Sequence, residues 1–180
     1  MAENKFPTEV VDLPSKGYYY PTDNPLSSGK IEIKYMTAKE EDILTSQNLI
    51  QKGIVLDKLL ESLVVDKKID LNSMLIGDKN ALFIASRVLA YGKEYTFDYT
   101  DTQGQSKEHT FDLTELKTKK IEDDIFKSGK NEFEFKLPKS KKVITFKMLT
   151  HGDEQEIAQT LKQAEKLTKI TGISHELTTR

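Results

Sequence analysis

The sequence predicts an α+β fold: a small antiparallel sheet built from two strand–cap–helix units, with an inserted helical segment and a projecting β-hairpin. Three observations support this prediction. Alternating apolar and charged residues at 30–35 lead directly into a helix-capping pattern, and the same succession returns at 143–154. Between these two segments, the apolar residues first have helical spacing and then alternate with polar residues, as in a strand. We therefore expect a single α+β domain over 30–180, preceded by an extended arm over 1–29.

Length and composition limit what this domain can do. The chain has 180 residues, 31% of them charged, and a formal net charge of −2. Such a balance does not favour a protein that coats nucleic acid, which needs a clear basic excess. The absence of cysteine excludes disulfides, thiolate zinc sites and cysteine nucleophiles. We expect a soluble protein of a reducing compartment, without a signal peptide and without an apolar stretch able to span a bilayer.

The arm over 1–29 is rich in residues that resist a helix. Prolines and glycines lie among three consecutive tyrosines. Because proline lacks an N–H and pushes its predecessor toward extended geometry, we expect a stiff, extended segment. Two interpretations of the tyrosines stay open: they pack on the domain's own surface, or they dock on a partner. For docking, the candidate contact residues are Leu13, Pro14, Lys16, Gly17, Tyr18, Tyr19, Tyr20 and Pro21.

The first strand–cap–helix unit is predicted over 30–52. Lys30–Tyr35 alternates isoleucine and tyrosine with charged residues, as a half-buried strand does. Thr37 followed by Glu40 has the spacing of a capping box, which starts a helix. Gly53 is the expected end of that helix.

The second unit, predicted over 131–172, repeats the first. Residues 143–154 align with residues 30–41, and both segments run from a strand through an apolar residue to a threonine cap. Thr150 is the second cap and again has an acidic residue three positions later. We expect the two units to pair their strands and to lay their helices on one face of the resulting sheet.

The segment over 54–92 is predicted to be a helical insertion that completes the core. A leucine stripe at i, i+3, i+4 and i+7 from Leu56 marks one helix, and a short helical turn follows near Leu71–Ile76. In the next and clearest helix we expect Asp78 as the N-cap and Gly92 as an αL C-cap. Arg87 interrupts its apolar middle and should need a carboxylate partner or an exit to solvent.

A projecting hairpin is predicted over 93–116, because Tyr95, Phe97 and Tyr99 alternate with polar residues before a polar turn containing Gly104. Two more strands follow around Phe133–Leu137 and Val143–Met148. The aromatic residues Phe133, Phe135 and Phe146 alternate with charges and should face inward. Nearby lysines are expected to be solvated or to block strand pairing, which leaves nucleic-acid binding a weaker interpretation. They are Lys136, Lys139, Lys141, Lys142 and Lys147.

Catalytic and metal-binding patterns are nearly absent. No phosphate-cradling loop or nucleophile motif is complete, and His109, His151 and His175 lack metal-ligand spacing. The carboxylates cluster in predicted first turns of helices, where the helix dipole favours them. We therefore expect no catalytic residue, no cofactor and no metal. A hydrolase using scattered carboxylates is kept as a third hypothesis.

Several motifs resemble a known family. They are Asp12-Leu-Pro-Ser-Lys-Gly-Tyr-Tyr-Tyr-Pro, the stretch Ser28–Thr45, Leu75-Ile-Gly-Asp-Lys-Asn-Ala, and Arg87-Val-Leu-Ala-Tyr-Gly-Lys-Glu-Tyr. Together they resemble the baseplate proteins of T-even-type contractile-tailed bacteriophages, and the resemblance covers most of the chain.

This resemblance implies a non-enzymatic structural component associated with the baseplate hub, which docks on other baseplate or hub proteins and on copies of itself. Its location would be the tail baseplate of the virion, and the host cytoplasm during assembly. The alternative is a transient chaperone of hub assembly that is absent from the mature virion. Some relatives carry cysteines near the projecting hairpin, and this chain has none, so no zinc role is expected. Relatives also extend beyond the segment matching His175–Arg180, which implies that a C-terminal portion can be missing here.

Overall fold

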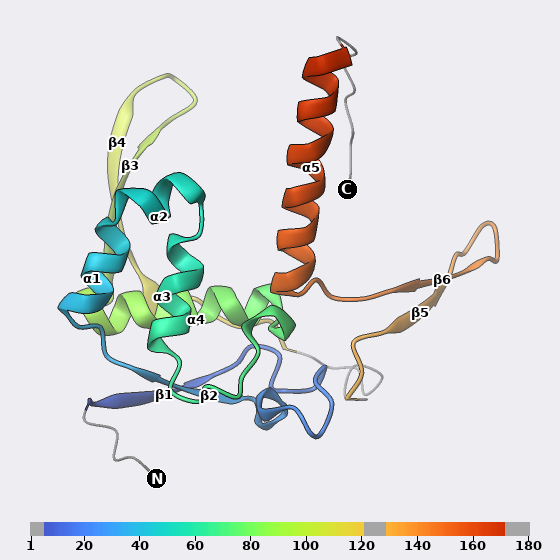
Figure 1. Ribbon diagram of the computed structural model, residues 1–180, viewed down its shortest axis with the longest axis horizontal. Helices are drawn as coiled ribbons and strands as arrows, with labels where there is room; N and C mark the ends of the chain where they lie inside the picture. Colours follow the sequence, from blue (N-terminus) through green and yellow to red (C-terminus); the bar gives the residue numbers. More distant parts are fainter. Residues whose placement is uncertain (1–5, 121–128, 172–180) are drawn as a thin grey trace.

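The structure is a computed structural model that describes residues 6–120 and 129–171. These residues form five α-helices and three separate two-stranded antiparallel sheets, which confirms the predicted α+β class. Figure 1 shows four helices gathered on one side of the first sheet, with two hairpins and the last helix extending outward. Among the described residues, no helix combines the length and the apolar character needed to cross a membrane.

The predicted arm begins with a strand that joins the domain. β1 (Thr8–Asp12) pairs in antiparallel register with β2 (Lys30–Lys34). The loop between them contains one turn of 3-10 helix, η1 (Pro25–Ser28), and closes where the Leu13 N–H donates to the Gly29 carbonyl at 2.8 Å. From Thr8 onward, the segment predicted as an arm is therefore part of the folded domain. The predicted boundary between arm and domain, at residues 29 and 30, falls between β1 and β2, which pair with each other.

The core lies between β2, α3 (Val55–Leu63) and α4 (Ile76–Tyr91) and includes part of the predicted arm. Tyr19 and Tyr20 are 7% and 4% exposed, so both rings are core side chains. Three residues of the predicted leucine stripe of α3, Leu59, Leu60 and Leu63, face the same interior, whereas Leu56 is exposed. Large side chains with less than 2% exposure are Leu26, Ile33, Leu60, Leu63, Met74 and Leu82.

The first strand–cap–helix unit forms around a buried carboxylate. α1 (Ala38–Thr45) follows β2, and Glu40 accepts hydrogen bonds from the N–H and the hydroxyl of Thr37, at 2.9 and 2.5 Å. Lys34 and Ser62 donate to its other oxygen at 2.7 and 2.5 Å. Burial alone would raise the pKa of Glu40, but the hydrogen bonds from Lys34, Ser62 and Thr37 outweigh it and lower the pKa to about 2.

The helix predicted to run from this cap to Gly53 is broken once. Ser46 is extended, with ψ of 105°, and separates α1 from α2 (Gln47–Lys52). Gly53 adopts the predicted αL conformation and ends α2.

The second unit repeats the first down to its hydrogen bonds. α5 (His151–Thr171) follows β6 (Val143–Phe146), and the N–H and hydroxyl of Thr150 donate to Asp153 at 3.0 and 2.9 Å. Lys147 donates to the other oxygen of Asp153 at 2.7 Å, and this contact with the hydrogen bonds from Thr150 lowers the pKa of Asp153 to about 2. The repeat is therefore confirmed at the cap, where these three residues occupy the places of Lys34, Thr37 and Glu40.

The two units do not pair their strands, so that part of the prediction is wrong. β2 pairs with β1, and β6 pairs with β5 (Phe133–Lys136), the segment that precedes it along the chain. The backbone of each unit forms one isolated β-bridge with the helical insertion, Ile33 with Val64 and Leu75 with Thr150. Alternation and capping specify a strand and the helix after it, but they carry no information on which strand will be the partner.

The central helix α4 begins earlier than predicted. Its N-cap is Leu75, and Asp78 lies inside the first turn, 1% exposed. The prediction of Asp78 as the cap is wrong, because its carboxylate accepts hydrogen bonds from the N-terminal segment. Gly92 ends the helix with φ of 83° and ψ of 174°, which is not the predicted αL conformation.

The two expected outcomes for Arg87 are also decided. Its guanidinium lies over the rings of Tyr91 and Tyr95, 4.8 and 5.6 Å from their centroids. Among the described residues, Arg87 has no carboxylate partner. Its side chain instead leaves the core, and cation–π interactions with the two tyrosine rings stabilise its charge.

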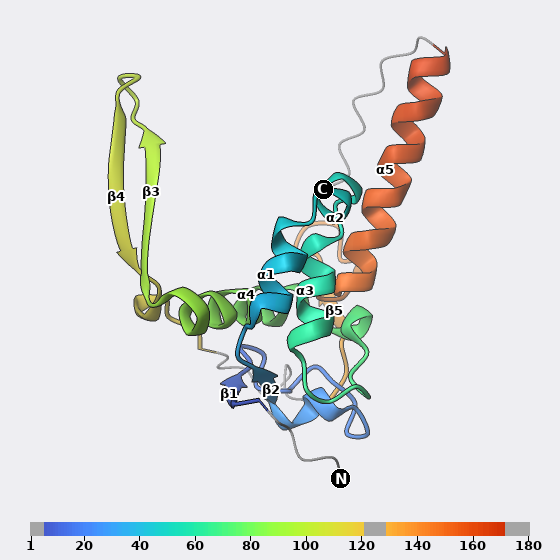
Figure 2. The same cartoon turned by 60° about the vertical axis from the view of Figure 1, so that its left-hand side comes forward.

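The hairpin of β3 (Glu94–Thr100) and β4 (Ser106–Asp112) projects from the end of α4, as Figure 2 shows. A short 3-10 helix, η3 (Leu113–Glu115), follows it. Tyr95, Phe97 and Tyr99 share one face of the hairpin and are 43%, 39% and 45% exposed.

The hairpin of β5 and β6 differs from its prediction. Phe133 is 7% exposed and packs edge-on against Tyr19, with ring centroids 5.7 Å apart. Phe135 and Phe146 are 51% and 43% exposed, so the inward orientation is confirmed for Phe133 alone. Figure 1 shows why: beyond its base the hairpin extends away from the body, and no second layer covers it.

Candidate docking groove

One buried carboxylate at the start of α4 holds the N-terminal segment against the helix. Asp78 accepts hydrogen bonds from the Ser15 N–H at 2.9 Å, the Ser15 hydroxyl at 2.7 Å and the Tyr20 hydroxyl at 2.6 Å. The Tyr20 hydroxyl in turn accepts the N–H of Leu75 at 2.9 Å. Burial and the negative charge of Asp78 raise the pKa of Tyr20, so its proton stays in the hydrogen bond. We call Ser15, Tyr20, Leu75 and Asp78 the Asp78 lock.

Two glycines let the segment fold back on itself beside this lock. Gly17 and Gly29 have φ of 77° and 71°, and they lie back to back across the loop. A Cβ on Gly17 would come within 2.2 Å of the Ser27 carbonyl oxygen, and a Cβ on Gly29 within 2.7 Å of Lys16 backbone atoms. Both positions therefore require glycine, for conformation and for space.

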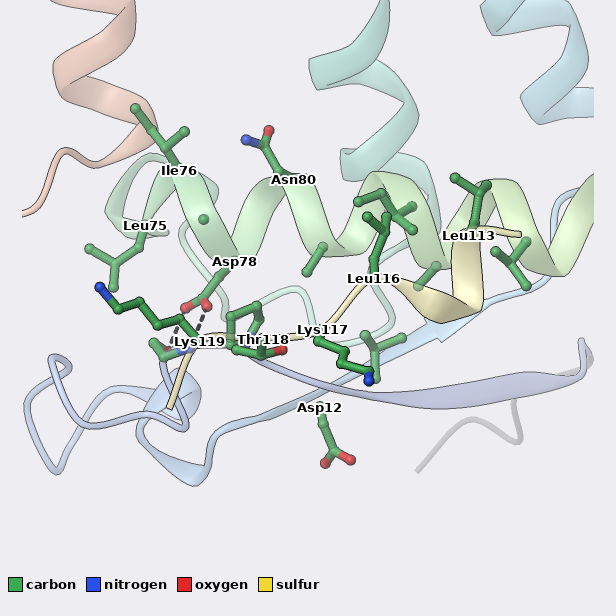
Figure 3. A pocket seen from close by; sticks show the side chains of 18 of the residues that line it. Asp12, Leu75, Ile76, Asp78, Asn80, Leu113, Leu116, Lys117, Thr118 and Lys119 are labelled. Atoms are coloured by element: carbon green, nitrogen blue, oxygen red, sulfur yellow. Dashed lines mark hydrogen bonds between the residues drawn. The ribbon is translucent and has the colours of Figure 1, made fainter. Parts of the chain in front are cut away.

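A groove runs along α4 next to the lock. It has a volume of about 1070 Å³ and is lined mainly by apolar side chains. Figure 3 shows α4 on one side of the groove, the strip Leu113–Lys119 running alongside it, and β1 below. α4 contributes Ala81, Ile84, Ala85, Val88 and Leu89, and the N-terminal segment contributes Pro14, Ser15 and Tyr19.

The groove exists because α4 is apolar around more of its circumference than the core can cover. Leu82 and Ser86 face the interior and are buried. Ile84 and Val88 lie on another side of the helix and are only half-buried. An apolar helix side left open in this way is a favourable surface for another apolar segment.

Charges of both signs surround this apolar floor. Glu9 and Asp12 come from β1, and Lys117 and Lys119 come from the strip opposite. Neither Lys117 nor Lys119 forms an ion pair with another residue of the part that the structure describes. Their ammonium groups are therefore available to an acidic partner.

The structure separates the sequence-predicted contact residues into three groups by their exposure. Leu13, Gly17, Tyr19 and Tyr20 are buried within the chain. Pro14 and Tyr18 are half-buried, and Lys16 and Pro21 are exposed. Of the eight, Pro14 and Tyr19 line the groove.

Sequence reasoning missed Asp78 as the residue that anchors the segment. The available signal was the ionisable pair Asp78-Lys79 inside an otherwise apolar helix, since buried charges need partners from elsewhere in the fold.

A second buried polar cluster joins α5 to the rest of the fold. His151 is 5% exposed, with Nδ1 3.0 Å from the Lys79 ammonium and Nε2 3.1 Å from Asp57. Lys79 also donates to Glu154 and lowers the pKa of that carboxylate. Both ring nitrogens of His151 are therefore engaged by neighbours, and Gln155 also lies 3.0 Å from Nε2. Neither here nor in the other described parts of the chain do three His, Asp or Glu side chains gather in a way that could hold a metal ion.

Comparison with known proteins identifies the family. A family model described as T4 bacteriophage base plate protein matches residues 9–170, a range that contains both strand–cap–helix units, the Asp78 lock and the groove. No curated protein and no solved structure matches the chain. Because the matched range spans nearly the whole sequence, this chain belongs to the T4 bacteriophage base plate protein family and has a structural role in the phage baseplate.

Proposed function

We propose that this protein is a structural component of the tail baseplate associated with the central hub, and that it acts by protein–protein docking. The observation that carries the proposal is the open apolar groove on α4. Its walls are fixed by the Asp78 lock and by β1–β2 pairing, so the groove is preorganised. Open apolar surface of this kind is unfavourable in water and is typical of an interaction site.

The occupant that fits the groove is an apolar segment of a neighbouring hub protein that carries carboxylates toward Lys117 and Lys119. Apolar side chains would cover Ile84 and Val88, and the acidic groups would set the orientation. In this proposal the predicted contact residues have two roles. Lys16 and Pro21 are exposed and available for contact, whereas Leu13, Tyr19 and Tyr20 hold the wall in place.

We also infer that the protein is not an enzyme. Glu40 and Asp153 each accept several hydrogen bonds at helix caps, and Asp78 accepts three in the lock. These carboxylates already satisfy partners of the same chain, which supports a structural assignment. Turnover of a phosphoester, glycoside or peptide substrate that is lost on changing a single Asp or Glu would support the hydrolase hypothesis instead.

A pair of matched variants tests the docking role. Ile84→Glu places a carboxylate in the groove, and Ile50→Glu makes the same change on α2, at a side chain that is 46% exposed and does not line the groove. Both variants should fold, as judged by circular dichroism and thermal unfolding. We expect Ile84→Glu to be depleted from purified phage tails in quantitative mass spectrometry, and Ile50→Glu to be retained. Equal incorporation of both variants would contradict groove docking.

Quantitative mass spectrometry of unaltered particles distinguishes a structural component of the tail from a transient chaperone. A structural component is present in a fixed ratio to the other baseplate proteins, and a reconstruction of the tail would locate it beside the hub. A chaperone that leaves before the tail is finished would be absent from the particles or far below stoichiometric.

A further inference from the structure

The two projecting hairpins carry unpaired charges of opposite sign. In the β3–β4 hairpin, Glu94, Asp98 and Glu108 share one face, opposite the aromatic face. Asp98 lies directly across from Glu108 in the strand register, and neither forms an ion pair with any described residue. Like charges placed opposite each other destabilise a hairpin, so this face favours a basic neighbour.

The β5–β6 hairpin carries the complementary charge. Glu134 is the one acidic residue of β5 and β6, and from Phe135 to Gly152 the chain contains none. The hairpin and its turn contain four lysines that form no ion pair with another described residue. They are Lys136, Lys139, Lys141 and Lys142.

The two hairpins of one chain do not meet. Figure 1 shows β3–β4 and β5–β6 extending from opposite sides of the body, and Figure 2 shows the same separation from another direction. Each hairpin is a two-stranded ribbon, and no further strand from residues 6–120 or 129–171 pairs with it. An isolated ribbon of this kind is marginally stable in water and gains from a neighbour.

We propose that the β5–β6 hairpin of one copy lies alongside the acidic face of the β3–β4 hairpin of a second copy. This inference rests on the proposed docking function and adds a specific contact to it. Two acidic faces repel each other and so do two lysine-rich turns, so the charges favour contacts between unlike hairpins over contacts between like ones. Two reciprocal contacts of this kind close a two-fold dimer, whereas single head-to-tail contacts lead to a ring or a filament.

This contact is expected to be weak between free molecules and to depend on salt. Exposed ion pairs contribute little individually, and they gain strength when many copies are held close together in an assembly. We therefore test it by covalent capture rather than by affinity.

The chain contains no cysteine, so single cysteines can be introduced without background. Thr100→Cys places one on the acidic face, and Thr145→Cys places one on β6. The two full-length proteins are mixed and treated with a bis-maleimide crosslinker, and the covalent dimer is measured by gel and mass spectrometry. Gln51→Cys, on exposed α2, replaces Thr145→Cys in the control mixture.

We expect the Thr100→Cys and Thr145→Cys mixture to give at least about tenfold more dimer than the control at low salt, and to lose that excess at about 1 M salt. Adding Asp98→Lys and Glu108→Lys to the first protein should abolish the excess. Adding Lys139→Glu and Lys142→Glu to the second protein should then restore it. Crosslinking equal to the control, or a loss without rescue, would overturn the proposal.

The protein composition of purified tails distinguishes a failure of the self-contact from a failure of the proposed function. If the chain is stoichiometric in purified tails but the hairpins do not crosslink, the self-contact is wrong and the baseplate role stands. If the hairpins crosslink but the chain is absent from tails, the self-contact stands and the virion role is wrong. A third outcome is that tails carrying the Asp98→Lys and Glu108→Lys protein lose a different hub protein and that copies do not crosslink. That outcome would assign the β3–β4 hairpin to the other protein and overturn the self-contact.

Discussion

Replacing Tyr20 by phenylalanine tests whether one buried hydroxyl holds the N-terminal segment on α4. The hydroxyl donates to Asp78 at 2.6 Å and accepts the Leu75 N–H at 2.9 Å. Phenylalanine keeps the ring but removes one donor from the carboxylate and leaves the Leu75 N–H without its acceptor. A hydrogen bond to a charged group contributes about 1.5–3 kcal/mol and an unpaired buried donor costs about 1–3 kcal/mol. Because contributions within one hydrogen-bond network are not additive, we expect a total loss of about 2–4 kcal/mol, below the upper end of the sum.

The assay is urea unfolding of the full chain, followed by circular dichroism and extrapolated linearly to water. In thermal unfolding the same loss corresponds to a decrease of about 2–4 °C in Tm per kcal/mol for a protein of this size. Tyr35→Phe is the matched control, because its hydroxyl makes only a long, exposed contact of 3.4 Å with Glu9. We expect that control to change the free energy of unfolding by less than about 0.5 kcal/mol. Equal unfolding midpoints for the two variants would refute the idea that the lock anchors the segment.

Three further predictions concern protonation and backbone conformation. Because burial and Asp78 raise the pKa of Tyr20, its contribution is present below the ordinary tyrosine value and is lost as the pH rises; urea midpoints should fall above about pH 10, and fall less in Tyr20→Phe. The pKa of Glu40 is lowered to about 2, so its contribution is present above its ordinary value of 4.5 and is lost as the pH falls toward about 2. Glu40→Gln should flatten that acid dependence in circular dichroism and reduce the free energy of unfolding by about 2–3 kcal/mol; an unchanged acid transition would contradict this assignment. Gly17 and Gly104 have nearly equal φ, 77° and 78°, but only Gly17 lacks room for a Cβ. Gly17→Ala should therefore cost about 3 kcal/mol or more in thermal unfolding and Gly104→Ala about 1 kcal/mol; similar costs would show that space at Gly17 does not matter.

Local patterns in the sequence predicted most of the elements. The capping boxes at Thr37 and Thr150, the leucine stripe of α3 and the alternation of β3 each depend on residues within a few positions of one another. Such interactions form wherever the segment lies in the fold, so the structure confirms them with small shifts in their ends. The repeat was predicted for the same reason. The equivalence of its lysines became visible only in the structure, where Lys34 pairs with Glu40 and Lys147 pairs with Asp153.

The candidate site was less predictable, because its parts come from distant segments. Asp78 follows a glycine and has the sequence signature of a helix cap, yet its partners Ser15 and Tyr20 lie 63 and 58 positions away. No local pattern encodes that distance. The same limit applies to Phe135 and Phe146, whose alternation indicates a strand face but not whether another layer covers it.

The sequence by itself determined most of the strands and helices, that a strand–cap–helix unit occurs twice, and that cysteine chemistry is excluded. The tertiary structure decided that β1 completes the first sheet, that Tyr19 and Tyr20 belong to the core, and that one side of α4 stays open as a groove. The physical reason is range: caps and periodicity arise between neighbours along the chain, whereas strand partners and burial depend on which distant segments meet and exclude water.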